Sequence, residues 1–392
     1  MPRIEDCSVT DVRRVNVSVR RADRTAGANW RAMLVAIAAV TAPVWPLQAA
    51  EIPPTTGMAR LFSLVGDYPL GEAASRADYQ SFDPTSSKLY IAKMGSGKLL
   101  AFDAAKNSLI AERDGFPKVT GVLVVPELHR VYASVPGAGL VPSIIVGLGM
   151  AGLSSGRAVI SVLDSNDLHE VARLPGGVFP DGLAYDPVHQ RVFVSDELGS
   201  AILVLDAKAD QTIARIEVGG EVGNVRYDPV SKRIYAPLQS RGKLVVVDPA
   251  GLGIVARFPL PDGRHPHGLA IAPGAAIGYV ACDGDDRLLV VDLRSGAVIG
   301  RQPLGHNPDV LAIDPGQHRL YVASESGMLS SFDIADEHEP HSLGDVFVGD
   351  SARSVAVDAK SHRLYFPLAD VKGRMLLRVL EPKDFPATGQ KR

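Results

Sequence analysis

One short pattern occurs seven times along this chain: an apolar run that ends in an Asp-Pro-like turn and continues as an Arg/Lys-aromatic strand, as in GLAYDPVHQRVFVS from Gly182. The turn residue serves as a register mark, and the marks are Asp83, Val125, Asp186, Asp228, Ala272, Asp314 and Asp358. Successive marks are 42, 61, 42, 44, 42 and 44 residues apart. A period near 42 residues, built from short strands, predicts one propeller blade per copy.

Each copy divides into four strand-like pieces, which in the third copy are GLAYD, RVFVSD, AILVLD and TIARIEV. The last copy contains only three pieces, and we expect ARLFSLV, Ala59–Val65, to supply the fourth. The sequence therefore predicts an all-β, seven-bladed β-propeller over residues 59–382, closed by an N-terminal strand that completes the last blade. A linker over 51–58 and a C-terminal tail over 383–392 are expected to flank it.

The copies resemble the YVTN-type repeat of bacterial propellers, most clearly in RLYVASESGMLSSFD and RVFVSDELGSAILVLD. The resemblance extends over nearly all of the chain after the N-terminal region. It implies a fold shared with lactonase-type propellers, with the heavy chain of amine dehydrogenases, and with the haem or copper propellers of denitrification. Because one fold can carry unrelated functions, the resemblance implies an architecture rather than an activity.

The N-terminal region has the pattern of a secretory signal. An apolar run of 15 residues, Met33–Leu47, follows four arginines and precedes the small-residue exit Gln48-Ala49-Ala50. The run is short for a membrane span and is interrupted by two prolines, although an N-terminal membrane anchor is the alternative. We predict a signal region over residues 1–50 and a periplasmic or secreted protein without a transmembrane segment in its mature part.

The charge of the chain bears on which classes of partner it binds, and its cysteine content bears on disulfide formation. After removal of residues 1–50 the chain carries 34 basic and 40 acidic residues, and no basic block stands out within the copies. This composition argues against nucleic acid as the main partner. Cys282 is then the only cysteine, at the end of an apolar strand, and is expected to be a buried thiol.

The channel mouth is the expected functional face. The position five residues before each register mark should begin an innermost strand, and these positions hold Asp78, Thr120, Asp181, Gly223, His267, Asp309 and Arg353. Glu197 and Glu325, from loops joining second and third strands, are expected over the same mouth. The predicted ligand-binding residues are Asp78, Thr120, Asp181, Asn224, His306, Asp309, Glu197 and Glu325. The alternative is structural, since channels are hydrated and Asp can simply cap a turn.

Two chemical hypotheses arise from this ring. Asp181, His267 and Asp309 form a candidate metal site, and calcium or zinc is the candidate cation. The stretch HPHG, which contains His267, resembles one found in lactonase-type propellers. That resemblance implies catalytic roles for His267 as general base and for Arg353 as the clamp on developing negative charge.

An insertion of about twenty residues interrupts the second copy, over Pro136–Ala158, and is rich in glycine and apolar residues. It is expected on the mouth face as a lid over the channel, as a segment that docks onto a partner or contacts a membrane, or as a self-packed loop. The predicted function is binding of a small polar ligand or a protein partner on the channel face. The alternatives are a lactonase-like hydrolase or lyase, which could depend on a metal, and a propeller subunit of a periplasmic redox complex.

Overall fold

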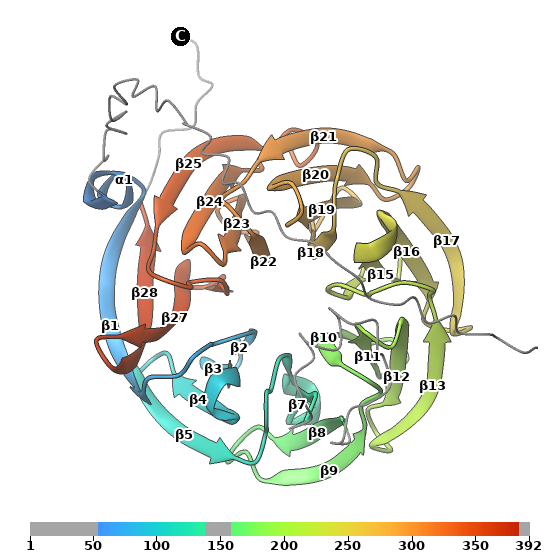
Figure 1. Cartoon of the computed structure of the whole chain (residues 1–392), viewed down its shortest axis with the longest axis horizontal. Coiled ribbons are helices and arrows are strands. Elements are labelled where there is room, and N and C mark those ends of the chain that lie inside the picture. The colour runs from blue at the N-terminus through green and yellow to red at the C-terminus, as the bar shows by residue number, and fades with distance from the viewer. Residues whose placement is uncertain (1–53, 138–157, 384–392) are drawn as a thin grey trace, which may run out of the picture. The chain divides into compact units, whose positions relative to one another are not determined.

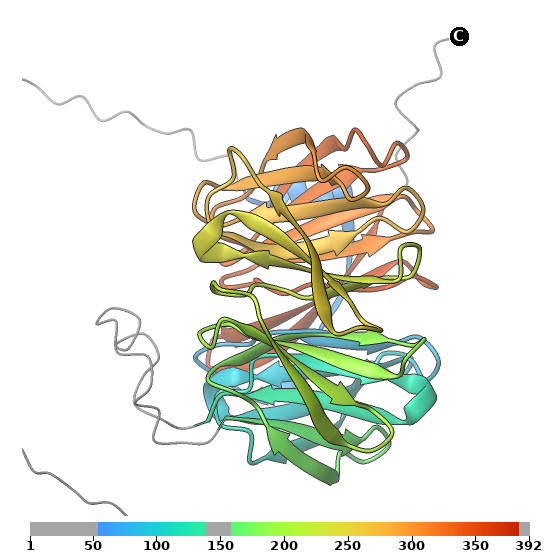
Figure 2. The ribbon, with the colours of Figure 1, turned by 90° about the vertical axis from the view of Figure 1, so that its right-hand side faces the viewer.

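The structure, a computed structural model, describes residues 54–137 and 158–383, with side chains from Gly57 onward. Its strands form seven antiparallel sheets of four strands each. Figure 1 shows the sheets as blades around a central axis, and Figure 2 shows the ring from its edge. The fold predicted from the repeat is therefore confirmed. The predicted signal region and nearly all of the insertion 136–158 lie outside the described residues.

The blades follow one another along the chain, and each runs from an innermost to an outermost strand. Blade 1 contains β2 (Gln80–Asp83), β3 (Lys88–Lys93), β4 (Lys98–Asp103) and β5 (Ser108–Asp114). Blade 2 contains β6 (Val122–Val125), β7 (Arg130–Val135), β8 (Val159–Asp164) and β9 (Glu170–Pro175). Blade 3 contains β10 (Pro180–Asp186), β11 (Arg191–Asp196), β12 (Ala201–Asp206) and β13 (Gln211–Glu217). Blade 4 contains β14 (Arg226–Asp228), β15 (Arg233–Leu238), β16 (Lys243–Asp248) and β17 (Gly253–Pro259).

The remaining blades repeat this order. Blade 5 contains β18 (Pro266–Ile271), β19 (Ile277–Cys282), β20 (Arg287–Asp292) and β21 (Val298–Pro303). Blade 6 contains β22 (Pro308–Asp314), β23 (Arg319–Ser324), β24 (Met328–Asp333) and β25 (His341–Phe347). Blade 7 contains β26 (Ala356–Asp358), β27 (Arg363–Val371), β28 (Arg374–Pro382) and, as its outermost strand, β1 (Phe62–Glu72). Short 3-10 turns occur at Met94–Ser96, Pro126–Leu128 and Gln239–Arg241.

The two ends of the described chain close the ring. β1 pairs antiparallel with β28, from Phe62 opposite Pro382 to Glu72 opposite Arg374. The strand begins three residues later than predicted, because Pro54–Leu61 forms helix α1. α1 lies against β25 of blade 6, and the Arg60 guanidinium donates a hydrogen bond to the Leu343 carbonyl at 3.0 Å. This pairing completes blade 7 and covers the edge of β28, which would otherwise be free to pair with another chain.

The register-mark aspartates explain why the repeat carries an Asp-Pro-like turn. Each ends an innermost strand and accepts hydrogen bonds from the turn that follows. The Asp228 carboxylate, fully buried, accepts bonds from the Val230 and Ser231 backbone N–H groups, each at 3.0 Å. Such side chains replace missing backbone acceptors and fix a tight turn. These register-mark aspartates are therefore structural residues, and they lie at the end of the channel opposite the mouth.

In blades 1 and 5 the tyrosine of the second strand joins the neighbouring blade. The Tyr90 ring is fully buried and its hydroxyl donates to the Ser165 carbonyl of blade 2 at 2.6 Å. The Tyr279 hydroxyl of blade 5 makes the same bond to the Glu337 carbonyl of blade 6 at 2.8 Å. A buried ring with a satisfied hydroxyl combines apolar packing with fixed orientation between blades. Cys282 is buried among apolar neighbours, as predicted, and burial raises its pKa to about 12.

Within residues 54–137 and 158–383, the structure contains no helix with the length and apolar character needed to cross a bilayer.

Candidate functional site

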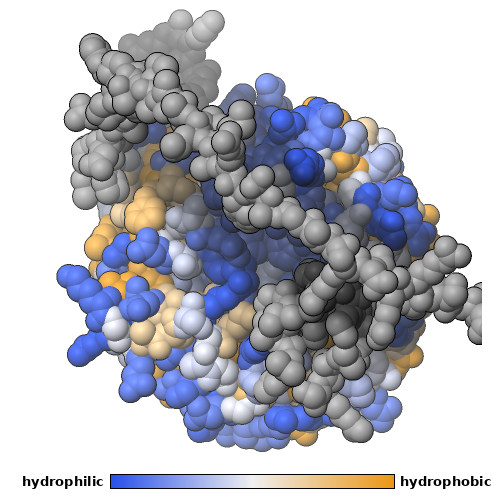
Figure 3. All heavy atoms as spheres, in the orientation of Figure 1, coloured by the Kyte–Doolittle hydropathy of each residue, from blue (hydrophilic) through white to orange (hydrophobic). Residues whose placement is uncertain are grey.

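Loops that lead into the innermost strands and loops that join second and third strands meet at one face of the ring. They enclose a cavity of about 590 Å³, which we call the mouth cavity. Hydrophilic side chains gather around the centre of this face in Figure 3. The predicted residues that line the cavity are Asp78, Thr120, Asp181, Glu197, His267, Asp309, Glu325 and Arg353. The repeat register therefore predicted which side chains meet.

Two predicted ligand-binding residues lie elsewhere. The His306 side chain is 72% exposed and pairs with Asp286 at 2.9 Å, so it points away from the cavity. Asn224 is fully buried between blades, where its side-chain oxygen faces Gly182. Gly223 occupies the ring position of blade 4 because a Cβ there would lie 2.5 Å from the His267 carbonyl oxygen. The ring thus has one position at which two innermost strands come too close for a side chain.

Asp309 is the centre of a buried charge network. Arg353 forms ion pairs with both Asp309 and Glu325, and His267 Nε2 lies 3.3 Å from Asp309 Oδ1. Burial alone would raise the pKa of Asp309, but Arg353 and His267 hold that pKa well below its usual range. Burial alone would lower the pKa of His267, but the Asp309 carboxylate raises it to about 9. At neutral pH this part of the mouth is therefore ionised and internally neutralised.

Arg76 extends the network towards blade 1. Its Nε lies 3.3 Å from Asp78 Oδ2, and its Nη1 lies 3.8 Å from Glu325 Oε1. Burial raises the pKa of Asp78, although the Arg353 and Arg76 charges oppose that rise. Each acid on this side of the mouth therefore has a cation beside it.

Asp181 differs from the other acids of the mouth. It is 5% exposed, and its side-chain contact is a weak hydrogen bond of 3.4 Å from the Tyr79 hydroxyl. Glu197, beside it, accepts a hydrogen bond from the neutral Gln239 amide at 2.9 Å. Burial, reinforced by the negative charges of Glu197 and Asp78, raises the pKa of Asp181 to about 7. Among the described residues, neither Asp181 nor Glu197 takes part in an ion pair, so the blade 3 side of the mouth lacks the paired cations of the Asp309 side.

Tyr79 is a central residue that the sequence interpretation missed. Its hydroxyl lies 3.1 Å from His267 Nε2 and 3.4 Å from Asp181 Oδ2, so it bridges blades 3 and 5. Burial, with the nearby Asp181 and Asp309 carboxylates, raises the pKa of Tyr79 well above its usual value. The repeat could have indicated Tyr79. The same register position in the other copies holds Gly121, Gly182, Asn224, Gly268, Val310 and Ser354, so a tyrosine there is unusual.

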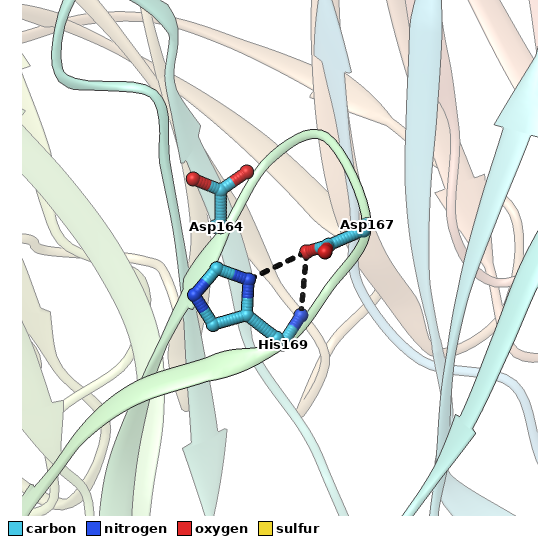
Figure 4. Close-up of side chains that lie close together, drawn as sticks. All are labelled: Asp164, Asp167 and His169. Carbon is cyan, nitrogen blue, oxygen red and sulfur yellow. Dashed lines mark hydrogen bonds and ion pairs between the residues drawn. The ribbon is translucent and has the colours of Figure 1, made fainter.

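The predicted metal set receives no geometric support. Asp309 already faces an arginine and an imidazole, which disfavour a cation at that carboxylate. Among the described residues, Asp164, Asp167 and His169 are the group whose ligand atoms lie within 4.8 Å of one another. They lie where β8 ends and turns into β9 (Figure 4), and none of them lines the mouth cavity. Asp167 accepts bonds from His169 Nδ1 at 2.7 Å and from the His169 backbone N–H at 3.0 Å, which is ordinary turn capping.

No protein-family model and no curated protein matches this sequence. A comparison of folds matches 1735 chains of solved structures, so the architecture is widely shared. One of these is a chain of Kuenenia stuttgartiensis hydrazine synthase. It aligns with a TM-score of 0.64 and 15% identity over 78% of this chain and 96% of that chain. At this identity the likeness shows the fold alone, and the YVTN-type repeat family stays a prediction.

Proposed function

We propose that this protein is a binding propeller whose mouth cavity captures a small polar ligand that carries a cationic group. The observation that carries the proposal is the buried Asp181 carboxyl in the cavity wall. Among the described residues, the ion pairs of lysines and arginines include neither Asp181 nor Glu197. His267 lies nearby, but its charge is paired with Asp309. A cationic ligand group would complete this side of the site, and the Tyr79 and Phe179 rings add aromatic faces to the wall.

The same geometry supports binding over lactonase-like catalysis. A general base must be unprotonated, whereas the Asp309 carboxylate favours the protonated form of His267 and raises its pKa to about 9. Arg353 is already held by two carboxylates, so it is not free to clamp a developing oxyanion. The hydrolase alternative therefore requires a rearranged mouth, and a lactone and ester turnover assay of the purified protein would test it directly.

The proposal is tested by thermal-shift screening of small amines, amino acids and neutral sugars, followed by calorimetric titration of the ligands that stabilise the protein. We expect cationic ligands to predominate and Asp181→Asn to weaken them about tenfold or more, since a charge-assisted contact is lost. Glu217→Gln is the matched control, because it removes an acid from the same blade at an exposed position outside the cavity.

The pH dependence gives a second readout. Because Asp181 must lose its proton to hold a cation, affinity should increase as pH rises through about 7 in the wild type. The Asp181→Asn variant should lack this increase. Equal affinity in the wild type and in Asp181→Asn would reject the proposed site, as would a screen in which only neutral ligands bind.

Export and a protein partner belong to the same proposal. The signal-like residues 1–50 support a periplasmic or secreted protein, and N-terminal sequencing of protein recovered from the cell envelope would test this. The segment 136–158 supports partner docking because the strands it connects, β7 and β8, place its ends on the mouth face. A pull-down in which deletion of 138–157 abolishes capture of one specific protein would support that role. Unchanged capture would reject it.

A further inference from the structure

A second cavity lies in the channel next to the mouth cavity. Its volume is about 360 Å³, and Tyr79 belongs to the walls of both. We call it the inner channel cavity. The innermost strands of blades 1 to 4 supply its walls, with Gln80, Ser81, Leu123, Tyr185, Arg226 and Tyr227 among the lining residues.

Arg226 is the unusual residue of this cavity. It lies two residues before the register mark of blade 4, on β14. The corresponding residues of the other blades are Ser81, Leu123, Ala184, Ala270, Ala312 and Ala356. The repeat therefore folds around a small or apolar residue at this position in six blades. The guanidinium of blade 4 is not required by the architecture.

The charge of Arg226 has no close counter-ion within the described residues. Its hydrogen bond runs from Nη1 to the adjacent Val225 carbonyl at 2.9 Å, and no ion pair includes it. Burial lowers the pKa of Arg226, so the protein pays a desolvation cost for holding the charge there. Tyr79 and Asp181 oppose this lowering of the Arg226 pKa. The pKa of Tyr79 is itself raised well above its usual value, and the pKa of about 7 leaves much of the Asp181 carboxyl protonated at neutral pH.

We propose that the inner channel cavity is an anion-binding site, in which the Arg226 guanidinium holds a small oxyanion such as a carboxylate or a phosphate. The guanidinium presents paired N–H donors that match the two oxygens of such a group. The cavity walls add hydrogen-bonding partners, since Gln80, Ser81 and three tyrosines also line it. A bound oxyanion would neutralise the Arg226 charge, which has no ion-pair partner among the described residues. The two proposals rest on different charged residues, Arg226 here and Asp181 at the mouth, and the two cavities share Tyr79.

The test uses the folded full-length mature protein with sodium phosphate and sodium acetate as probes. Thermal unfolding is followed against the concentration of each salt at constant ionic strength balanced with sodium chloride, and phosphate affinity is measured by calorimetry. We expect saturable stabilisation of the wild type, affinity weakened about tenfold or more in Arg226→Gln, and partial retention in Arg226→Lys. Arg233→Gln is the matched control, because it removes an arginine of the same blade that already pairs with Asp248.

A second measurement keeps the proposal falsifiable if the variants differ in folding. Without added oxyanion, Arg226→Gln should be at least as stable as the wild type, because a partly buried charge without an ion-pair partner is gone. The Asp181→Asn variant should bind the oxyanion at least as tightly, so the result is readable even if the mouth binds no ligand. Equal stabilisation of wild type and Arg226→Gln would overturn the proposal. Arg226-dependent stabilisation by chloride alone would also overturn it, by indicating a halide site.

Discussion

The two ends of a single strand, β10, carry the same amino acid in opposite situations. Asp186 ends the strand at the turn, fully buried, where it accepts a 2.9 Å bond from the Val188 backbone N–H and contacts His189 at 2.6 Å. Asp181 begins the strand at the mouth, also buried, with one weak contact to Tyr79. Burial is therefore similar, and the number of donors aimed at each carboxylate is what differs.

Blade 1 repeats the comparison with opposite pKa shifts. Burial alone would raise the pKa of Asp83, but hydrogen bonds from Ser86 and Thr85 lower it below the usual range. Burial raises the pKa of Asp78, despite the opposing charges of Arg353 and Arg76. The turn end of the channel thus uses Asp as a structural acceptor, whereas the mouth holds acids whose ionisation a ligand can change.

Among the acids of the mouth, we expect Asp309 to contribute most to the stability of the fold. Asp309→Asn leaves Arg353 and His267 buried without their common partner, and we expect a loss of roughly 3–5 kcal/mol in the free energy of unfolding. Urea denaturation at pH 7 measures it. Glu325→Gln is the control, since that side chain is 42% exposed and should cost less than about 1 kcal/mol. A loss below about 1 kcal/mol for Asp309→Asn would show that the network is not a structural element.

Asp181 should instead make the free energy of unfolding depend on pH. The folded-state pKa of about 7 lies above the ordinary value of 3.8, so the folded protein keeps this proton longer than the unfolded chain. The contribution of Asp181 to stability is therefore greatest below pH 4 and decreases as pH rises towards 7. We expect wild-type stability relative to Asp181→Asn to fall by up to about 1.4 kcal/mol for each pH unit in that window. Parallel pH profiles of the two proteins would contradict this.

Asp186→Ala tests the turn end of the same strand. The change removes a fully buried carboxylate that accepts bonds from the Val188 N–H and from His189, and we expect a loss of about 2 kcal/mol at neutral pH. Ligand affinity at the mouth should not change. Val188→Ala, at an exposed side chain in the same turn, should stay within about 0.5 kcal/mol of the wild type. Weakened ligand binding in Asp186→Ala would show that the two ends are coupled.

The smallest expected effect is that of Tyr79→Phe. The change removes a hydroxyl with contacts of 3.1 and 3.4 Å and keeps the ring, so it should cost about 1 kcal/mol of stability. It should also change the pKa of His267, which a histidine-resolved NMR titration measures. An unchanged His267 titration would indicate that the hydroxyl does not bear on the imidazole.

The sequence predicted the fold because the repeat encodes it in residues that contact their own turn or the next blade, as Asp228 and Tyr90 do. It predicted which side chains reach the mouth, because register alone places Asp181, His267 and Arg353. It did not predict their charge states, because these depend on donors from other blades, such as Arg353 at Asp309. The predicted positions of Asn224 and His306 were wrong. Asn224 is one residue away from the ring position Gly223, and a shift of one residue turns a strand side chain to the opposite face. His306 lies in the loop before β22, where the turn directs its side chain away from the cavity.

The pairing of β1 with β28 also determines when the ring can close during synthesis of the chain. β1 is among the first parts of the propeller to be synthesised and β28 is the last, yet each is the other's neighbour in blade 7. The ring therefore cannot close until β28 has been synthesised, and a chain that ends before Arg374 leaves the edges of β1 and β27 unpaired. Loss of β28 would therefore leave β1, at the other end of the described chain, without its partner strand. A premature stop before β28 would yield an open ring that is prone to aggregation.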